Sequence, residues 1–272
     1  MSAGQEPRLD FGARLRHAVD GLSVPGRLHV AAWEPDAPDR PLLIRADEAV
    51  TAASTIKVPI LAAALAEVNA GRLDLARPSV IPAERAGGSG VLRALPSLPA
   101  LTLADLLTLM IIVSDNTATN VVIDLVGMER VNEFCTEAGL NGTALRRKMM
   151  DADAKRRGLE NRTTARDQAT LLDAIAWRSL LPAPLRAFAL QALEGQQFND
   201  GLPSLLPDSV IVAHKTGELP GVRHDVGVIT GPDGRQAVVA VLLSDVDAGP
   251  SSPSATLAGI GLAAWRALGP DD

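Results

Sequence analysis

The sequence is poor in cysteine, in clustered positive charge and in long apolar runs. The single cysteine, Cys135, excludes an internal disulfide and a thiolate metal cluster, and its place in the helix-like run Val131–Ala138 predicts core packing. The net charge is −6 with both signs interspersed, which argues against a nucleic-acid-binding face. The apolar run Leu101–Val113 is shorter than a membrane span and is interrupted by Asp105, and residues 1–20 lack the apolar core of a signal peptide. The sequence as it stands predicts a cytoplasmic protein, or a periplasmic or secreted one from which a leader was removed.

Histidine offers no metal site, because no two histidines have the spacing of a ligand pair. They are His17, His29, His214 and His224. The segment Gly87–Val91 departs from Gly-x-Ser-x-Gly at its last position, which argues against a hydrolase with a Ser-His-Asp triad. We therefore expect no metal and no cofactor, and we expect a monomer that binds neither nucleic acid nor membranes.

The 272 residues suffice for one large domain or two packed lobes, and 47% of them are apolar. Helical periodicity predicts helices at Leu9–Leu22, Ile56–Ala70 and Ser254–Leu268, and most of the chain between residues 71 and 206 also looks helical. The predicted strands are Arg27–Trp33, Pro41–Arg45, Val210–Lys215, Val226–Thr230 and Ala237–Ser244. Because strands occur at both ends, we expect residues 1–53 and 207–272 to form one α/β lobe, with residues 54–206 as a mostly helical insertion.

A candidate nucleophile stands where the first long helix after the early strands begins. Ser54 and Lys57 are three residues apart, which places them on one helix face. A serine hydroxyl needs a base to remove its proton, and a buried lysine beside another cation can be that base. The alternative is a helix cap followed by a surface lysine.

A polar triplet, Ser114-Asp115-Asn116, separates two apolar helices and is expected on a turn at the rim of a cleft. The alternative is an ordinary turn with Asp115 or Asn116 as helix cap.

A third short motif, Lys215-Thr216-Gly217, is expected at the end of a strand. There its glycine would let a ligand lie close to the backbone, and its lysine and threonine would hold a carboxylate.

The three motifs, in this order, are the combination found in class A β-lactamases and penicillin-binding proteins. The chain resembles this family over almost its whole length. The resemblance implies an α/β (α+β) fold with an antiparallel sheet of about five strands, flanked by helices, and an inserted helical lobe.

Site roles follow from the resemblance. Ser54 would be acylated, with Lys57 as its proton partner, and Ser114 would relay a proton to the leaving nitrogen beside Lys215. The oxyanion hole would be the backbone N–H groups of Ser54 and Glu218. Substrate binding would use Asn116, for a side-chain amide, together with Thr216, Gly217 and Arg223 or His224, for a carboxylate.

The sequence departs from the family at the glutamate that activates the deacylating water. If Arg147 is the arginine that opens this loop, Met149 occupies the glutamate position, and a thioether is not a base. The nearest carboxylates are Asp151, Asp153 and Glu160, of which Asp151 is the candidate replacement. The pattern rejoins the family at residues 161–164.

Three functions remain open. The first is a β-lactamase, slow because of Met149. The second is a D-Ala-D-Ala peptidase, transferase or esterase, whose substrate is an acyl peptide or ester. The third is a non-catalytic penicillin-binding or sensor module. Relatives that use a tyrosine as general base are excluded, because the chain has no tyrosine.

Overall fold

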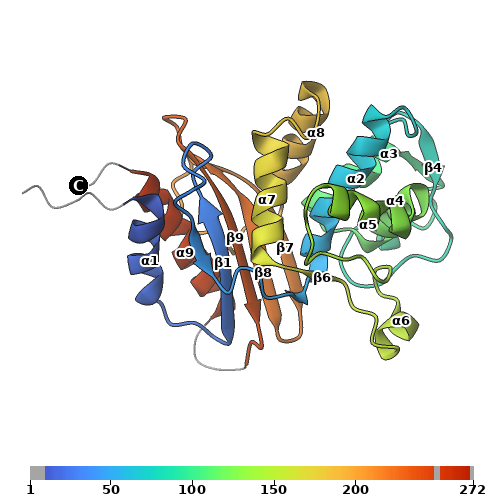
Figure 1. Cartoon of the computed structure of the whole chain (residues 1–272). Helices are drawn as coiled ribbons and strands as arrows, with labels where there is room; N and C mark the ends of the chain where they lie inside the picture. Colours follow the sequence, from blue (N-terminus) through green and yellow to red (C-terminus); the bar gives the residue numbers. More distant parts are fainter. Residues whose placement is uncertain (1–9, 248–251, 270–272) are drawn as a thin grey trace, which may run out of the picture.

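The computed structural model describes residues 10–247 and 252–269, which form a sheet with helices on both faces and a helical lobe beside it (Figure 1). The helices are α1 (Phe11–Asp20), α2 (Lys57–Asn69), α3 (Leu103–Ile112), α4 (Asn116–Val126), α5 (Met128–Glu137), α6 (Ala152–Arg156), α7 (Ala165–Ala176), α8 (Ala183–Glu194) and α9 (Pro253–Leu268), with 3₁₀ turns η1 (Ala53–Ile56) and η2 (Leu92–Ala94). The strands are β1 (Arg27–Trp33), β2 (Leu42–Ile44), β3 (Val50–Thr51), β4 (Pro78–Val80), β5 (Ala100–Thr102), β6 (Arg162–Thr163), β7 (Ile211–Leu219), β8 (Val222–Thr230) and β9 (Gln236–Ser244).

The main sheet joins both ends of the chain. Its strand order is β2-β1-β9-β8-β7, and all four pairings are antiparallel. The first long strand lies beside the last, with Val30 opposite Val241. The predicted five-stranded antiparallel sheet is therefore confirmed, while the exact division into lobes at residues 53 and 206 stays a prediction.

Strand β9 is apolar on both faces because both faces of the sheet are covered. Val238, Ala240 and Leu242 belong to the core shared with the helical lobe, whereas the alternate residues Val239 and Val241 belong to a second core. That second core lies under α1 and α9, which pack against each other (Figure 1). On the opposite face α7 packs against β1, β8 and β9.

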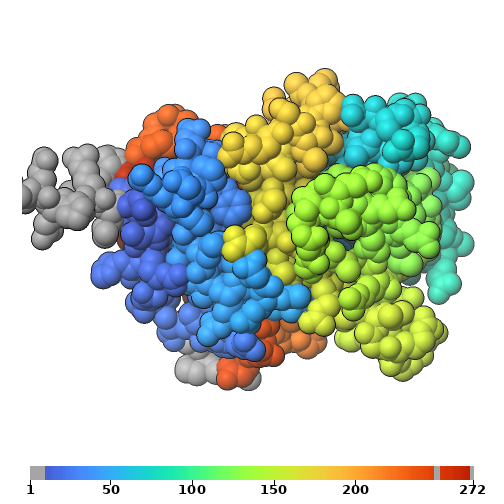
Figure 2. Space-filling view, viewed as in Figure 1, coloured from blue at the N-terminus to red at the C-terminus, as the bar shows by residue number. Residues whose placement is uncertain are grey.

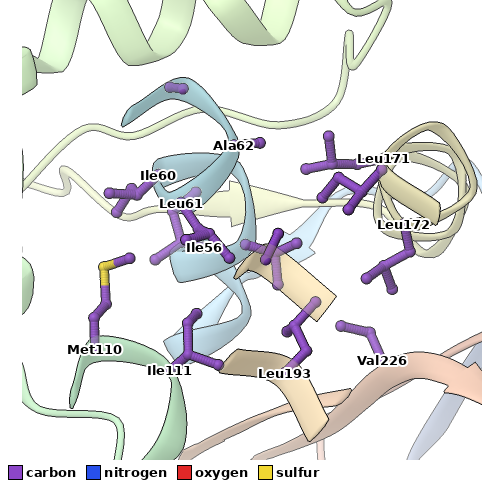
Figure 3. Packing of buried hydrophobic residues seen from close by; sticks show 14 of the residues in the cluster. Ile56, Ile60, Leu61, Ala62, Met110, Ile111, Leu171, Leu172, Leu193 and Val226 are labelled. Atoms are coloured by element: carbon purple, nitrogen blue, oxygen red, sulfur yellow. The ribbon is translucent and has the colours of Figure 1, made fainter. Parts of the chain in front are cut away.

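Helix α2 is the centre of the helical lobe. Its residues from 57 to 65 are all buried, as is typical of a helix that is apolar around its whole circumference. Figure 3 shows Ile60 and Leu61 of this helix facing Met110 and Ile111, which belong to α3. The turn with Ser54 and Lys57 therefore leads into a helix that is packed on every side.

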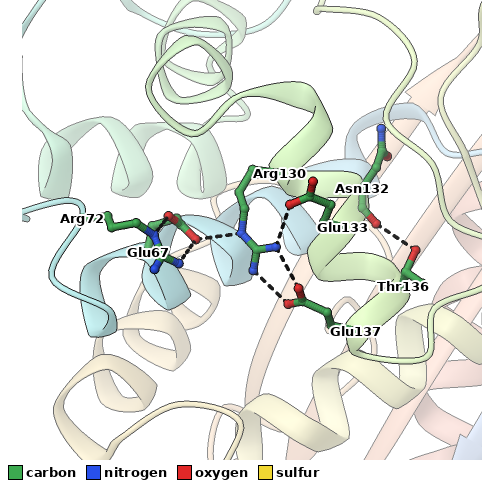
Figure 4. A network of polar contacts seen from close by, with 7 residues as sticks. All are labelled: Glu67, Arg72, Arg130, Asn132, Glu133, Thr136 and Glu137. Carbon is green, nitrogen blue, oxygen red and sulfur yellow. Dashed lines mark hydrogen bonds and ion pairs between the residues drawn. The ribbon is translucent and has the colours of Figure 1, made fainter.

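The C-terminal end of α2 also carries ion pairs. Glu67, whose side chain is 8% exposed, accepts from Arg72 and, at 2.8 Å, from the Nε of Arg130 on α5. Arg130 also pairs with Glu133 and, through two nitrogens, with Glu137 (Figure 4). These contacts fasten α5 to α2.

The space-filling view shows where the two parts of the molecule meet. The blue and orange segments of the sheet lie on one side, the cyan and green helical segments lie on the other, and the yellow segment lies between them (Figure 2). The yellow-green segment with α6 projects beside this junction. No described helix is long and apolar enough to cross a membrane.

Several expectations need correction. The Lys-Thr-Gly motif lies inside β7 rather than at the end of a strand, because pairing with β8 continues to Leu219. Of the two interpretations of Lys57, the buried lysine holds and the surface lysine does not, and Ser54 lies in the 3₁₀ turn before α2. The loop at residues 146–161 contains the short helix α6. Cys135 is buried in the core, as expected.

Candidate active site

The candidate active site is a cleft at the edge strand β7, where the sheet meets the helical lobe. A cavity of about 520 Å³ is lined by Ser54, Asn116, Met149 and Glu218, among other residues. A second cavity of about 480 Å³ adjoins it and is also lined by Ser54, together with Ser114, Thr216 and Arg223. Ser54 therefore lines both cavities.

The turn that carries Ser54 is compact and strained. Side chains three residues apart eclipse in a 3₁₀ turn, so Ser54 and Lys57 lie on one side of it. Ala53 has a φ of 46°, a left-handed conformation that costs a residue with a Cβ about 1 kcal/mol or more. Ser114, with a φ of 55°, is a second such residue in the cleft. Strain of this kind persists only where neighbouring contacts hold the backbone in place.

Lys57 is positioned to exchange protons. Its Nζ donates to the carbonyl oxygen of Ser114 at 2.8 Å, to the Ser114 Oγ at 2.9 Å and to the Asn116 Oδ1 at 2.9 Å. Burial lowers the pKa of Lys57 well below its usual value, the charge of Lys215 lowers it further, and Asp115 opposes both effects. This shift favours the neutral amine, which is the form of lysine that can accept a proton.

Asp115 is a structural member of its triplet. One carboxylate oxygen caps α4 by accepting from the N–H of Ala118, and the other accepts from the N–H groups of Val91 and Leu92. The side chain is buried and holds the loop at residues 87–92 against the cleft. The expected helix cap is thus Asp115, and its hold on the loop was not predicted, because that loop is distant in sequence.

Asn116 uses much of its amide within the protein. Its Oδ1 accepts from Lys57, and its Nδ2 donates to the carbonyl oxygen of Gly87 at 2.9 Å. Because an amide nitrogen carries two hydrogens, one remains for a ligand. Asn116 lines the cavity next to Ser54, in agreement with its predicted place.

Lys215 is fully buried within β7. Its Nζ donates to the carbonyl oxygen of Thr216 at 2.8 Å, and burial lowers its pKa to about 7, against the opposing charge of Asp225. Asp225 in turn pairs with the Nδ1 of His214 at 2.8 Å and accepts from the N–H of Leu202. The Asp225 carboxylate is thus held in place by His214 and Leu202.

Gly217 and Glu218 form the edge of the cleft. A Cβ on Gly217 would lie 3.2 Å from the backbone nitrogen of Ser54, so only a glycine lets the nucleophile turn approach the strand without displacement. The Glu218 side chain is exposed and pairs with Arg223, which also pairs with Asp200. Arg223 lines the second cavity, but two carboxylates already bind its guanidinium.

His224 is absent from the cleft. It is fully buried on β8, and its ring nitrogens are 2.8 Å from the carbonyl oxygen of Thr51 and 3.2 Å from the backbone nitrogen of Leu243. The expectation that it could anchor a substrate carboxylate is therefore wrong.

The loop at residues 147–160 is closed at its neck. Arg147 and Glu160 are joined by an ion pair of 2.7 Å, and the Asn161 Oδ1 accepts from the backbone nitrogens of Arg146 and Arg147. Inside the loop, the Asn120 side chain makes two hydrogen bonds to the backbone of Met149. Its Oδ1 accepts from the Met149 N–H at 2.8 Å, and its Nδ2 donates to the Met149 carbonyl oxygen at 3.1 Å. Met149 is therefore fixed in the wall of the cavity.

The nearby carboxylates are engaged elsewhere. Asp151 caps α6 by accepting from the N–H of Ala154 at 2.8 Å, and it is not among the residues lining the two cavities. Asp153 pairs with Arg156. Glu160 does line the cavity, but its Oε1 accepts from Arg147 and from the backbone nitrogen of Asn161. Asp151 as deacylation base stays a prediction without support from this geometry.

The fold and this arrangement of serine, two buried lysines and edge strand define the class of serine β-lactamases and penicillin-binding enzymes. The sequence profile described as the Beta-lactamase enzyme family matches residues 14–268. The extended-spectrum β-lactamase PER-1 of Pseudomonas aeruginosa is 27% identical over 231 residues, which cover 79% of this chain and 74% of PER-1. The chain belongs to the β-lactamase enzyme family.

Two solved structures show the likeness in three dimensions. A β-lactamase from Sphaerobacter thermophilus is 31% identical, with a TM-score of 0.82 over 96% of this chain and 98% of its own. A mutant of PBP-A, solved as an acyl-enzyme complex with penicillin G, is 27% identical, with a TM-score of 0.84 over 97% of this chain and 98% of its own.

Proposed function

We propose that this protein is an acyl-transfer enzyme that reacts with β-lactams through an ester on Ser54 and hydrolyses that ester slowly. The observation that carries the proposal is the position of Ser54, which lines both cavities and lies beside the buried Lys57. The acyl-enzyme with penicillin G described for the PBP-A mutant supports it by analogy.

Acylation uses groups that the cleft already holds. Neutral Lys57 takes the proton from Ser54 as the Oγ forms a bond to the lactam carbonyl carbon. The backbone N–H groups of Ser54 and Glu218 donate hydrogen bonds that stabilise the negative charge developing on the carbonyl oxygen. As the carbon–nitrogen bond breaks, Ser114 passes a proton to the leaving nitrogen and recovers one from Lys57, to which it is hydrogen-bonded. The acyl group remains on Ser54.

Lys215 and Thr216 suit a substrate carboxylate. Thr216 lines the second cavity, and Lys215, which precedes it on β7, would add a positive charge when it is protonated. Arg223 is a weaker partner for that carboxylate, because Glu218 and Asp200 neutralise it.

Deacylation lacks an evident base. The Met149 side chain lines the cavity beside Ser54, and its thioether cannot take a proton from water. Because Glu160 and Asp151 are bound to other groups, we expect an acyl-enzyme that persists for minutes or longer.

A second function, transfer of an acyl peptide or ester to an acceptor other than water, is favoured by the same position of Met149. Without a base that activates water, a neutral amine has the advantage as acceptor of the acyl group, because it is itself a stronger nucleophile than water. This function predicts turnover of acyl ester or peptide substrates and little turnover of lactams. A sensor module would instead form the adduct with no turnover of any substrate.

The experiment is intact-mass spectrometry with penicillin G, followed over time in wild type, Met149→Glu and Met149→Gln. The wild-type adduct should form and persist. Met149→Glu should shorten its lifetime by about tenfold or more, because Asn120 fixes the backbone from which the new carboxylate extends. Met149→Gln, of the same shape without a base, should not. Rapid loss of the wild-type adduct would refute slow deacylation.

A further inference from the structure

A buried histidine behind the cleft connects the main sheet to the nucleophile turn. His224 lies on β8 directly opposite Gly217, the residue against which the Ser54 turn packs. It is fully buried, and both of its ring nitrogens have backbone partners. Neither the acylation chemistry nor substrate binding uses it.

The ring has a defined tautomer. A carbonyl oxygen only accepts and a backbone N–H only donates, so the Nε2 of His224 donates to Thr51 while its Nδ1 accepts from Leu243. Burial, aided by the nearby His29, lowers the pKa of His224 to about 4, although its bond to the Thr51 carbonyl opposes this shift. The ring is therefore neutral near pH 7, and its two bonds join β8 and β9 to Thr51.

Thr51 lies three residues before the nucleophile. Between them is the strained Ala53, so the turn needs fixed points on its N-terminal side. One is the backbone bond from Ala52 to the carbonyl oxygen of Asn161, at 2.8 Å. A second is the bond from His224 to Thr51, a residue that also pairs with Arg162 of β6.

We propose that His224 is a positioning residue for the oxyanion hole, because its two hydrogen bonds set the place of the Ser54 turn against β7. One N–H of the hole belongs to Ser54 and the other to Glu218 on β7, so their separation depends on how the turn is fastened to the sheet. Gly217 permits the close approach, and His224, on the neighbouring strand, fixes it. This inference rests on the proposed function, since the hole matters only if Ser54 is acylated.

The test separates binding from chemistry. The acylation rate constant and the dissociation constant of penicillin G are measured by rapid-quench mass spectrometry for wild type, His224→Leu and His224→Gln. Because a misplacement of about 1 Å can cost about 10²-fold in rate, His224→Leu should lower the acylation rate constant by about 10- to 100-fold, with the dissociation constant within threefold of wild type. The amide of His224→Gln can donate and accept like the imidazole, so this variant should recover most of the rate.

His29→Leu is the matched control. His29 is also buried on the main sheet. In the strand register, His29 on β1 and His224 on β8 both lie opposite Leu242 of β9. The ring nitrogens of His29 face Arg45 and Ser244 rather than the nucleophile turn. His29→Leu should therefore leave the acylation rate constant within threefold of wild type. An equal loss in both leucine variants, no loss in folded His224→Leu, or no recovery in His224→Gln would overturn the proposal.

Two further readouts keep the test decisive. If His224→Leu does not fold, His224→Asn replaces it, since its shorter amide cannot reach both partners, and it should acylate at least tenfold more slowly than His224→Gln. If wild type forms no adduct, the proposed function fails. Amide hydrogen exchange at residues 52–55 then tests whether His224 holds the Ser54 turn in place. Faster exchange in His224→Leu than in His29→Leu supports the positioning role, and equal exchange overturns it.

Discussion

The two buried lysines predict a specific dependence of activity on pH. Burial lowers the pKa of Lys215 from 10.5 to about 7, which corresponds to a cost of roughly 5 kcal/mol for keeping its ammonium in the folded protein. Below pH 7 Lys215 is charged and attracts a substrate carboxylate. Above pH 7 it becomes neutral, so kcat/KM of the free enzyme for an anionic lactam should fall by about tenfold per pH unit.

In the proposed mechanism Lys57 accepts the proton of Ser54, so it has to be neutral, and we expect it to set the acid side of the profile. Burial and the charge of Lys215 both lower the pKa of Lys57, which favours an active form with Lys57 neutral and Lys215 charged. A plot of the second-order rate constant for acylation against pH should therefore be bell-shaped.

The assay measures second-order acylation by penicillin G from pH 5 to 9.5 in wild type and in Lys215→Arg. A guanidinium stays charged over this range, so the variant should lose the alkaline limb and keep the acid limb. A wild-type rate that stays constant from pH 6 to 9, or the same alkaline limb in both proteins, would refute this reasoning.

Three other changes test separate contacts. Asp225→Asn removes the charge that raises the pKa of Lys215, so the alkaline limb should move to lower pH, whereas an unmoved limb would show that Asp225 does not act on the lysine. Glu67, with its pKa lowered to about 2 by Arg72 and Arg130, stabilises the fold above pH 4.5, and this stabilisation is lost as the pH falls from 4.5 to 2. Glu67→Gln should cost about 2 kcal/mol in urea unfolding at pH 7 and little at pH 2, and an equal cost at both would contradict the ionic account. Asp115→Ala leaves three backbone N–H groups without their acceptor and should cost about 3 kcal/mol, while a loss below 1 kcal/mol would show that the loop at residues 87–92 is held by other contacts.

Sequence patterns predicted the fold well because hydrophobic periodicity reports burial directly. The expected strand Arg27–Trp33 matches β1, and the expected helix Ile56–Ala70 matches α2 to within one residue at each end. The end of β7 was misplaced, because Thr216 to Glu218 are polar or small and their pairing depends on the tight turn at Pro220 and Gly221. That dipeptide was an available turn signal.

Within the candidate site, sequence spacing predicted which residues close in the chain lie together, but it missed the contacts between residues far apart in the chain. Ser54 and Lys57 are three residues apart, so their common side of the turn follows from helix geometry alone. The contact of Asp115 with Val91 and the contact of His224 with Thr51 join residues far apart in the chain, and no periodicity reports them. His224 and the cleft-lining Arg223 are neighbours on β8, so alternation along the strand sends their side chains to opposite faces of the sheet.

The central claim is that Ser54 is the residue acylated, and peptide mapping tests it most directly. The protein is incubated with penicillin G, digested and sequenced by tandem mass spectrometry, with Ser54→Ala treated in parallel. The account predicts one penicilloyl group, on the peptide that contains Ser54, and no mass increase in Ser54→Ala. A penicilloyl group on another residue, an adduct that survives in Ser54→Ala, or no adduct in wild type would contradict it.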